Sequence, residues 1–341
     1  MKFERVRAAF SALSAKLSST GLVIADDPAP PSLPGFLDAV FRGIGQVMLQ
    51  NNSYVGLIFL AGIFYNSTIL GWAALLGAIA STATAVLLGA ERSRVSGGLF
   101  GFNGALVAIA LLYFLEPNFL TWGYVILAAA CTTIVMAALL NFLGTWNVPV
   151  LTAPFVITTL FFVLAGARFG RLQTTDILPT AGLPTSATVE GVVTASTVVE
   201  GLFNGIAQVF FQGSTITGIF FVVGLLINSR VACSAALLGS IAGMLVAWGM
   251  GAAEPAIRSG AFGFNCVLTA IAFTGGVFVV NVASIAYVSL AVVTTAVVFA
   301  AMSAALEPLG MPALTSPFVL VVWLFLLASP HLRRLRKATV Q

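Results

Sequence analysis

The polar residues best suited to contact a solute are uncharged and occur as three pairs. The members of each pair stand in matching sequence contexts in the two halves of the chain. The pairs are Gln46 with Gln208, Asn103 with Asn265, and Thr152 with Thr315. Amide and hydroxyl side chains donate and accept hydrogen bonds without carrying charge. This chemistry favours contact with a small neutral polar solute over contact with an ion.

Each pair also has a purely structural interpretation. An Asn in a GFN segment often bonds a neighbouring backbone group and stabilises a broken helix, and we favour this role for the Asn pair. Both Thr residues precede a proline by two positions, which is typical of a helix N-cap, although an N-cap can also line a path. The Gln pair lies in short apolar elements, and for it we favour a role in a pore.

Apolar side chains recur at matched positions near these amides. They are Phe102 with Phe264, Phe155 with Phe318, and Leu106 with Leu268. An apolar slot edged by aromatic faces and hydrogen-bond acceptors would pass a flat, neutral molecule that carries N–H donors. It would offer little to a hydrated ion, because burying a charge without a partner is costly.

Groups for ion coupling, catalysis or metal binding are missing from the predicted spans. An intramembrane charge or histidine usually marks coupling or proton transfer, and the spans contain none by our placement. The only histidine, His331, lies in the basic C-terminal tail, and Cys131, Cys233 and Cys266 show neither metal-ligand nor disulfide spacing. We therefore expect no enzyme activity, no metal and no cofactor.

The composition is typical of a helical membrane protein. Of 341 residues, 59% are hydrophobic and 8% are charged, whereas soluble domains contain about 25% charged residues. Apolar runs repeatedly reach the roughly 17 to 25 residues that cross a hydrocarbon core of about 30 Å. Basic residues cluster near the two ends of the chain, which indicates membrane topology and no nucleic-acid partner.

Two diverged copies of one unit explain the pairing of the polar residues. The matched motifs are GIGQVMLQ at 43–50 with GIAQVFFQ at 205–212, GLFGFNGALVAIA at 98–110 with GAFGFNCVLTAIA at 260–272, and PVLTAPF at 149–155 with PALTSPF at 312–318. The offset between the copies stays constant to within one residue. Three motifs in the same order and register indicate an internal repeat.

Each copy contains one apolar element of about 12 residues, too short to span a membrane, and five longer segments. We place those of the first copy near 37–49, 54–70, 71–89, 99–115, 119–140 and 152–167, and those of the second near 200–212, 216–229, 231–249, 261–278, 281–303 and 315–329. Five crossings is an odd number, so the second copy enters from the opposite side. The predicted fold is an all-α polytopic membrane protein of two inverted repeats, each with five transmembrane helices and one short re-entrant helix.

The prediction divides the chain into five parts. They are a cytoplasmic N-terminal arm (1–35), the first repeat (36–167), an external connection (168–199), the second repeat (200–329) and a basic cytoplasmic tail (330–341). Basic residues at both ends place both termini in the cytoplasm, which agrees with ten crossings. Arg168, Arg171 and Arg258 fall in predicted outer loops and weaken this bias.

Taken together, GIGQVMLQNN, GLFGFNGAL, NVPVLTAPF and their second-half partners resemble the urea transporter family, from Gly35 to Ala328. The doubled GFN and doubled LTxPF motifs are specific in combination. The resemblance implies a homotrimer in a lipid bilayer, here the plasma membrane or bacterial inner membrane, with one pore per protomer. It also implies passive conduction of urea through an outer and an inner site separated by a narrower middle.

The resemblance also implies roles for individual residues. Gln46 and Gln208 would contact urea N–H groups at the two end sites, and the Thr pair, Thr152 and Thr315, would face the constriction. The walls of the apolar slot would be Phe102, Leu106, Phe264 and Leu268, with Leu49 and Phe211 three positions after each Gln. Because an aromatic wall in one half becomes Leu49 in the other, stacking there is expected to be weaker. Some bacterial members have Glu in place of Gln208, and the neutral amide would not attract cations.

Three functional hypotheses follow. The first is a passive urea channel, and the second is a passive channel for another small neutral solute such as water, ammonia or a short amide. Paired pore histidines and NPA repeats, typical of common ammonia and water channels, are absent. The third is an ion-coupled transporter, which needs an acidic residue facing the path. We rank them in this order.

Overall fold

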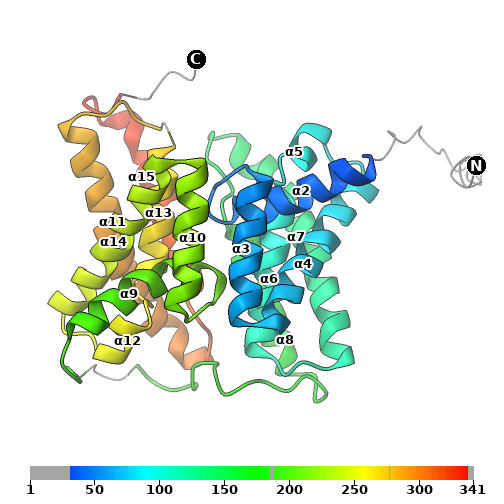
Figure 1. The fold of residues 1–341 in the computed structure, drawn as a ribbon, viewed down its shortest axis with the longest axis horizontal. Helices are drawn as coiled ribbons and strands as arrows, with labels where there is room; N and C mark the ends of the chain where they lie inside the picture. The colour runs from blue at the N-terminus through cyan, green and yellow to red at the C-terminus, as the bar shows by residue number, and fades with distance from the viewer. Residues whose placement is uncertain (1–30, 185–187, 276, 337–341) are drawn as a thin grey trace, which may run out of the picture. The chain divides into compact units, whose positions relative to one another are not determined.

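Apolar helices make up most of residues 31–184, 188–275 and 277–336, which are the residues that the computed structural model describes (Figure 1). Within these ranges there is no strand, and Leu115 pairs with Thr174 in an isolated β-bridge. The all-helical class predicted from the sequence is confirmed for this part of the chain.

The same order of helices occurs twice. The first half contains α2 (Leu33–Gln46), α3 (Ser53–Asn66), α4 (Thr68–Leu87), α5 (Arg92–Ser96), α6 (Gly101–Phe114), α7 (Phe119–Gly144) and α8 (Ala153–Gly166). The second half contains α9 (Ala195–Ala207), α10 (Thr215–Asn228), α11 (Arg230–Gly249), α12 (Glu254–Arg258), α13 (Gly263–Thr274), α14 (Val282–Leu306) and α15 (Ser316–Ala328). Three 3-10 turns, η1 (Gln208–Phe210), η2 (Glu307–Leu309) and η3 (Ser329–His331), follow α9, α14 and α15. The repeat in sequence is thus matched by a repeat of elements.

The structure corrects several predicted boundaries. The five-residue helices α5 and α12 were not predicted. The helix α2 begins at Leu33, before the predicted 37–49, because a proline is tolerated in a first turn. The helix α9 begins inside the predicted connection 168–199, since Thr194 and Thr197 form a reciprocal capping box at its start.

Five helical segments of the described residues are long and apolar enough to cross a membrane. They are α4, α7, α11, the stretch Glu254–Thr274 that includes α12 and α13, and the stretch Val282–Leu309 that includes α14. A sixth results if α9 and α10, bent by 74°, form one broken span. The helices α3, α6 and α8 have 14 residues each, fewer than the roughly 20 of a full crossing. A multi-pass membrane protein is therefore supported, while ten complete crossings stay a prediction.

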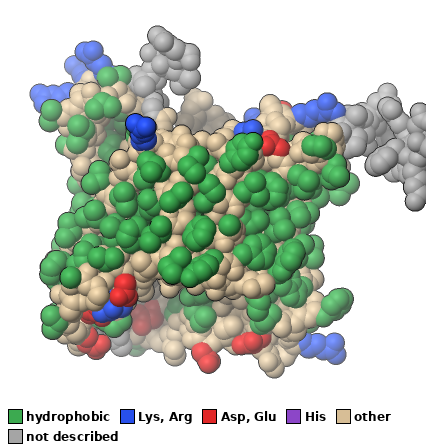
Figure 2. All heavy atoms as spheres, viewed as in Figure 1, with side chains coloured by type: hydrophobic (Ala, Val, Ile, Leu, Met, Phe, Trp, Pro, Cys, Tyr) green, Lys and Arg blue, Asp and Glu red, His purple; other side chains and the backbone are tan. Residues whose placement is uncertain are grey.

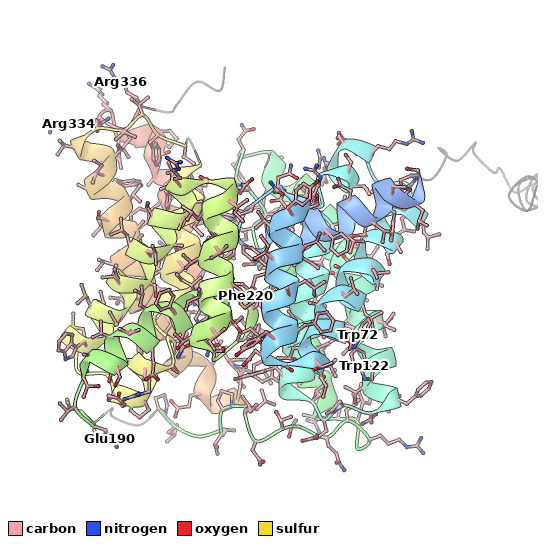
Figure 3. All side chains as sticks on the ribbon, viewed as in Figure 1. Trp72, Trp122, Glu190, Phe220, Arg334 and Arg336 are labelled. Carbon is pink, nitrogen blue, oxygen red and sulfur yellow. The ribbon has the colours of Figure 1, made fainter. Side chains whose placement is uncertain are left out.

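Charged side chains lie at two opposite ends of the visible face, and hydrophobic side chains cover the band between them (Figure 2). Arg334 and Arg336 lie at one end, and Glu190 lies at the other (Figure 3). The short helix α5 is at the end that also holds Arg334, whereas its counterpart α12 is at the opposite end (Figure 1). This banded distribution is the one expected for a protein with lipid around its middle.

The core is built around α6 and α13, the two helices that begin with the GFN motif. All residues of α6 except Tyr113 are buried. Close approach requires glycine: a Cβ on Gly77 of α4 would lie 2.3 Å from the carbonyl oxygen of Gly104, and one on Gly239 of α11 would lie 2.6 Å from that of Cys266. Small residues allow such backbone contact between membrane helices. The two halves therefore repeat the same packing, α4 on α6 and α11 on α13.

Candidate solute pathway

The predicted slot residues Leu49 and Phe211 lie in tight turns at the ends of the short helices. Both have left-handed backbone conformations, with φ of 59° and 60°. Their backbone N–H groups donate to the carbonyl oxygens of Gln46 and Gln208, at 2.9 and 3.0 Å. Non-glycine residues seldom adopt positive φ, so a turn of this kind at both positions indicates a specific structural requirement.

The two LTxPF motifs form a second pair of turns. Leu151 and Leu314 have φ of 56° and 51°, and each precedes the threonine at the N-cap of α8 or α15. These helices begin inside the protein, where their first N–H groups need partners.

The GFN amides supply those partners. The Asn103 Oδ1 atom accepts from the Phe155 backbone N–H at 3.1 Å, and its Nδ2 donates to the Leu151 carbonyl at 3.4 Å. The Asn265 side chain repeats both bonds, to Phe318 at 3.2 Å and to Leu314 at 3.1 Å. The structural role favoured for the Asn pair is confirmed, although the bonded backbone is distant in sequence and not adjacent.

The Thr pair meets where the two halves come together. The Oγ1 atoms of Thr152 and Thr315 are 2.6 Å apart, and the residues are 2% and 3% exposed. The predicted N-cap position is correct, but neither hydroxyl caps its own helix. The two hydroxyls instead form one buried hydrogen bond across the halves.

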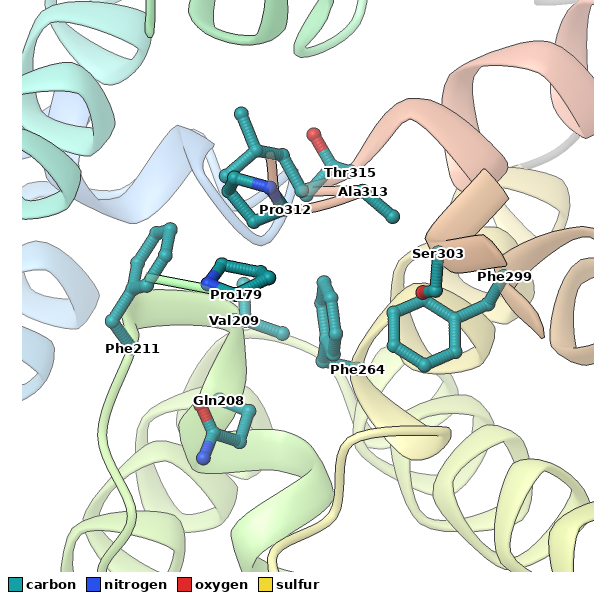
Figure 4. Close-up of a pocket in the computed structure, with 11 residues that line it drawn as sticks. Pro179, Gln208, Val209, Phe211, Phe264, Phe299, Ser303, Pro312, Ala313 and Thr315 are labelled. Atoms are coloured by element: carbon teal, nitrogen blue, oxygen red, sulfur yellow. The ribbon is translucent and has the colours of Figure 1, made fainter. Parts of the chain in front are cut away.

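A cavity of about 230 Å³ lies beside Thr315 in the second half (Figure 4). Its lining consists of Pro179, Gln208, Val209, Phe211, Phe264, Phe299, Ser303, Pro312, Ala313, Leu314 and Thr315. None of these eleven residues carries a charge. At about 30 Å³ per water, the volume corresponds to roughly eight water molecules. The cavity therefore combines amide and hydroxyl groups with aromatic walls and admits a small molecule.

The structure brings together four of the ten predicted site residues in this cavity: Gln208, Phe211, Phe264 and Thr315. The fifth second-half residue, Leu268, is fully buried in α13. It is not among the residues that line the cavity.

The first-half residues are arranged more tightly. Phe102 and Leu106 are 4% and 0% exposed. Gln46 and Leu49 are half-buried, and the Gln46 Nε2 donates to the Gly97 carbonyl at 3.1 Å. That bond directs one Gln46 donor toward the protein backbone, whereas the Gln208 side chain borders the cavity.

Seven of the eleven lining residues were not predicted, and three of them, Pro179, Phe299 and Ser303, lie outside the repeated motifs. Phe299 and Ser303 lie four positions apart on α14, and the Phe299 ring packs edge-on against Phe264 with centroids 5.6 Å apart. The N-caps Asn118 of α7 and Asn281 of α14 set an offset of 163 here, so their first-half counterparts are a methionine and a leucine, and they do not form matched pairs. Pro179 belongs to the connection between the halves and has no counterpart. Only the four-residue spacing on a helix could have suggested Phe299 and Ser303.

Charged groups lie outside this cavity. The Arg42 guanidinium bonds the Asp38 carboxylate on α2 and holds the pKa of Asp38 below its usual value. Arg258 on α12 bridges Glu200 at 2.9 Å and Glu254 at 2.7 Å. Within the described ranges, no group of three or more His, Cys, Asp or Glu residues is placed to hold a metal ion. The chemistry at the cavity is therefore hydrogen bonding and apolar contact.

Comparison with known proteins covers nearly all of these elements. The sequence model of the family described as urea transporter matches residues 37–330. Urea transporter 1 of Ovis aries is 31% identical over 305 residues, which cover 87% of this chain and 78% of that protein. For urea transporter 1 of Capra hircus the identity is 30% over 305 residues, and for that of Rattus norvegicus it is 28% over 302 residues, with the same two coverages. A match that includes both copies of every motif identifies the chain as a member of the urea transporter family.

Proposed function

We propose that this protein is a passive urea channel whose pore runs between the two halves of the chain. The observation that carries the proposal is the uncharged cavity formed by Gln208, Phe211, Phe264 and Thr315. Urea is flat and neutral, with four N–H donors and one carbonyl acceptor. An amide and a hydroxyl beside aromatic faces match that combination of polar edge and flat face.

The path continues from the cavity past the Thr pair into the first half. The 2.6 Å contact between the hydroxyls marks the narrow middle, because a solute there must replace their mutual bond with its own. Beyond it, Gln46, Leu49 and Phe102 form the second end site. Leu106 and Leu268, both fully buried, support the slot walls from α6 and α13.

An inverted arrangement of the two copies is part of the proposal. It is supported by the positions of α5 and α12 at opposite ends of the body (Figure 1) and by the hydroxyl pair, in which the two equivalent residues touch. Contact between equivalent residues is expected on a pseudo-twofold axis. In inverted-repeat transporters the substrate site lies near such an axis at mid-membrane.

The chemistry of the lining supports passive conduction. An ion-coupled mechanism requires a charged or titratable group at the solute or ion site. The cavity residues include none. We also propose that the protein functions as a homotrimer, as its family resemblance implies, in the plasma membrane or bacterial inner membrane. Both termini would lie in the cytoplasm, as the basic residues near the two ends of the chain indicate.

The test is urea flux in proteoliposomes, followed by stopped-flow light scattering. We expect urea flux well above that of empty vesicles, and the same rate at pH 6 and pH 8 and with or without a Na⁺ gradient. The variant Gln208→Leu should lower the flux, whereas Gln173→Leu, at an exposed glutamine outside the cavity, should not. Flux equal to that of empty vesicles would refute the proposal. Flux of acetamide or water without urea would support the broader class of neutral-solute channel instead.

A further inference from the structure

A second glutamine follows each left-handed turn and encloses it. Gln50 and Gln212 are 3% and 0% exposed. The side-chain Nε2 of each donates to the carbonyl two residues earlier, at 2.8 Å to Met48 and at 2.7 Å to Phe210. Their backbone N–H groups donate back to the short helices, at 3.1 and 3.2 Å. Each glutamine thus makes two bonds to backbone carbonyls that precede the slot residue, and the turn at the slot residue lies between these carbonyls and the glutamine.

An asparagine from the other half holds each of these glutamines. Asn66, the last residue of α3, donates from Nδ2 to the Gln212 Oε1 at 2.8 Å. Asn228, the last residue of α10, donates from Nδ2 to the Gln50 Oε1 at 2.7 Å. The same amide pair therefore occurs twice, each time joining a turn in one half to a helix end in the other.

We infer that Asn66 and Asn228 are positioning residues that fix the slot walls of the opposite half through Gln212 and Gln50. The inference rests on the proposed function in one respect, namely that Leu49 and Phe211 face the solute. The reasoning is that a left-handed turn at a non-glycine residue persists only when its surroundings impose it. Here the surroundings include a bond that exists only when the halves are packed together.

The consequence is greatest for Phe211, because its ring stands among first-half aromatic residues. Its centroid is 5.3 Å from that of Tyr113, 5.9 Å from Phe114 and 6.1 Å from Phe155. The same ring lines the cavity. A shift of the turn would therefore tilt the aromatic wall and alter which solutes fit against it.

The two amide pairs differ in their support. The Asn228 Oδ1 also accepts from the Asn52 Nδ2 at 3.0 Å. At the repeat offset, the residue that corresponds to Asn52 is Ser214, whose hydroxyl caps α10 by accepting from the Thr217 N–H. Among the described residues, Asn66 accordingly has one side-chain hydrogen bond where Asn228 has two. The substitution Ser214→Asn should add the missing donor and still cap the helix.

Amide hydrogen exchange of the full-length protein, read by mass spectrometry, tests the positioning directly. In Asn66→Leu we expect exchange at Phe211 and Gln212 to accelerate about 2- to 10-fold, the factor for one lost hydrogen bond, with Leu49 and Gln50 unchanged. Asn228→Leu should show the reverse pattern and serves as the matched control. Ser214→Asn should slow exchange at Phe211 and Gln212. Unchanged exchange, or equal acceleration at both turns in each variant, would overturn the inference.

Solute selectivity tests the link to the pore. In proteoliposomes, Asn66→Leu should change the ratio of urea flux to 1,3-dimethylurea flux by about 2-fold or more, since a tilted Phe211 alters the fit of the bulkier solute. An unchanged ratio alongside locally faster exchange would show that the amides hold the turns without governing the walls, and this would overturn the inference. Wild-type protein that conducts no urea would refute the proposed function, while the exchange pattern would still decide whether the asparagines position the turns.

Discussion

Replacing the Thr pair with valine is the sharpest perturbation that the structure offers. Valine keeps the shape of threonine and exchanges the hydroxyl for a methyl group. The variants are Thr152→Val, Thr315→Val and the double substitution. Because the two hydroxyls are buried and 2.6 Å apart, each is the partner of the other.

The stability of these variants should be strongly non-additive. A single substitution leaves one buried hydroxyl without its partner, which costs about 1 to 3 kcal/mol of unfolding free energy. The double substitution removes both groups and should be nearly neutral. A double-mutant cycle on the thermal unfolding of the purified protein should therefore give a coupling of about 2 to 6 kcal/mol, the sum of the two single costs, with the double variant more stable than that sum predicts.

The hydrogen bond between the two hydroxyls also sets the expected effect of these substitutions on urea flux. A solute that leaves its hydration shell at this point recovers hydrogen bonds to the two hydroxyls, each worth about 0.5 to 1.5 kcal/mol net. Losing both raises the barrier by about 1 to 3 kcal/mol, which slows flux roughly 5- to 150-fold at 25 °C. Stopped-flow urea flux per reconstituted protein measures this factor. Only the double variant should combine near-normal stability with slow urea flux.

A matched control exists in Thr217, another buried threonine that bonds across the halves, with its hydroxyl donating to the Gly62 carbonyl at 3.1 Å. It does not line the cavity. Thr217→Val should lower stability by about 1 kcal/mol and leave urea flux unchanged. A stable double variant of the Thr pair with wild-type flux would refute the reasoning, because the solute would then cross the protein without meeting these hydroxyls.

Two further predictions concern the supporting structure. Asn103→Ala and Asn265→Ala each remove two bonds to the turn before α8 or α15, and each should lower the unfolding free energy by roughly 2 to 4 kcal/mol, measurable as a lower midpoint of thermal unfolding; a midpoint within 1 °C of wild type would contradict that role. The bond from Arg42 lowers the folded-state pKa of Asp38, so its stabilisation is present above the unfolded pKa of about 4 and is lost as pH falls through the folded pKa. In Asp38→Asn, the unfolding free energy should therefore fall less between pH 5 and pH 2 than it does in the wild type. The difference between the two proteins should be small, because the Asp38 carboxylate is partly exposed.

The long helices of the fold could be predicted from the length and apolarity of the hydrophobic runs in the sequence. The repeated motifs placed every long helix, because a hydrophobic run of sufficient length has few alternatives in a membrane. The helices α5 and α12 escaped prediction because five residues give no periodic signal. They pack on α2 and α9, and such tertiary packing is not encoded in a hydrophobicity pattern.

The site was predictable where both copies keep the same kind of residue. That rule found Gln208, Phe264 and Thr315, and the family resemblance added Phe211. It did not find Phe299, because the counterpart of that residue in α7 is a methionine. The comparison of the two copies could not predict the amide pairs between the halves. The partners are separated by 146 and 178 positions in the sequence, and packing alone brings them together.

The two copies share the backbone turns beside the candidate pathway but differ in the side chains of its walls. The four left-handed turns at the slot and LTxPF positions have nearly the same φ in both copies, and the same amide contacts hold them. The walls differ, with Leu49 in one half and Phe211 in the other. A strained turn needs its partners in each copy, whereas a wall residue needs only to be apolar and to fit. Unequal walls can bind urea with different affinity at the two ends, but a passive channel still shows zero net flux at equal concentrations. The asymmetry should therefore appear only as different half-saturating urea concentrations for influx and efflux.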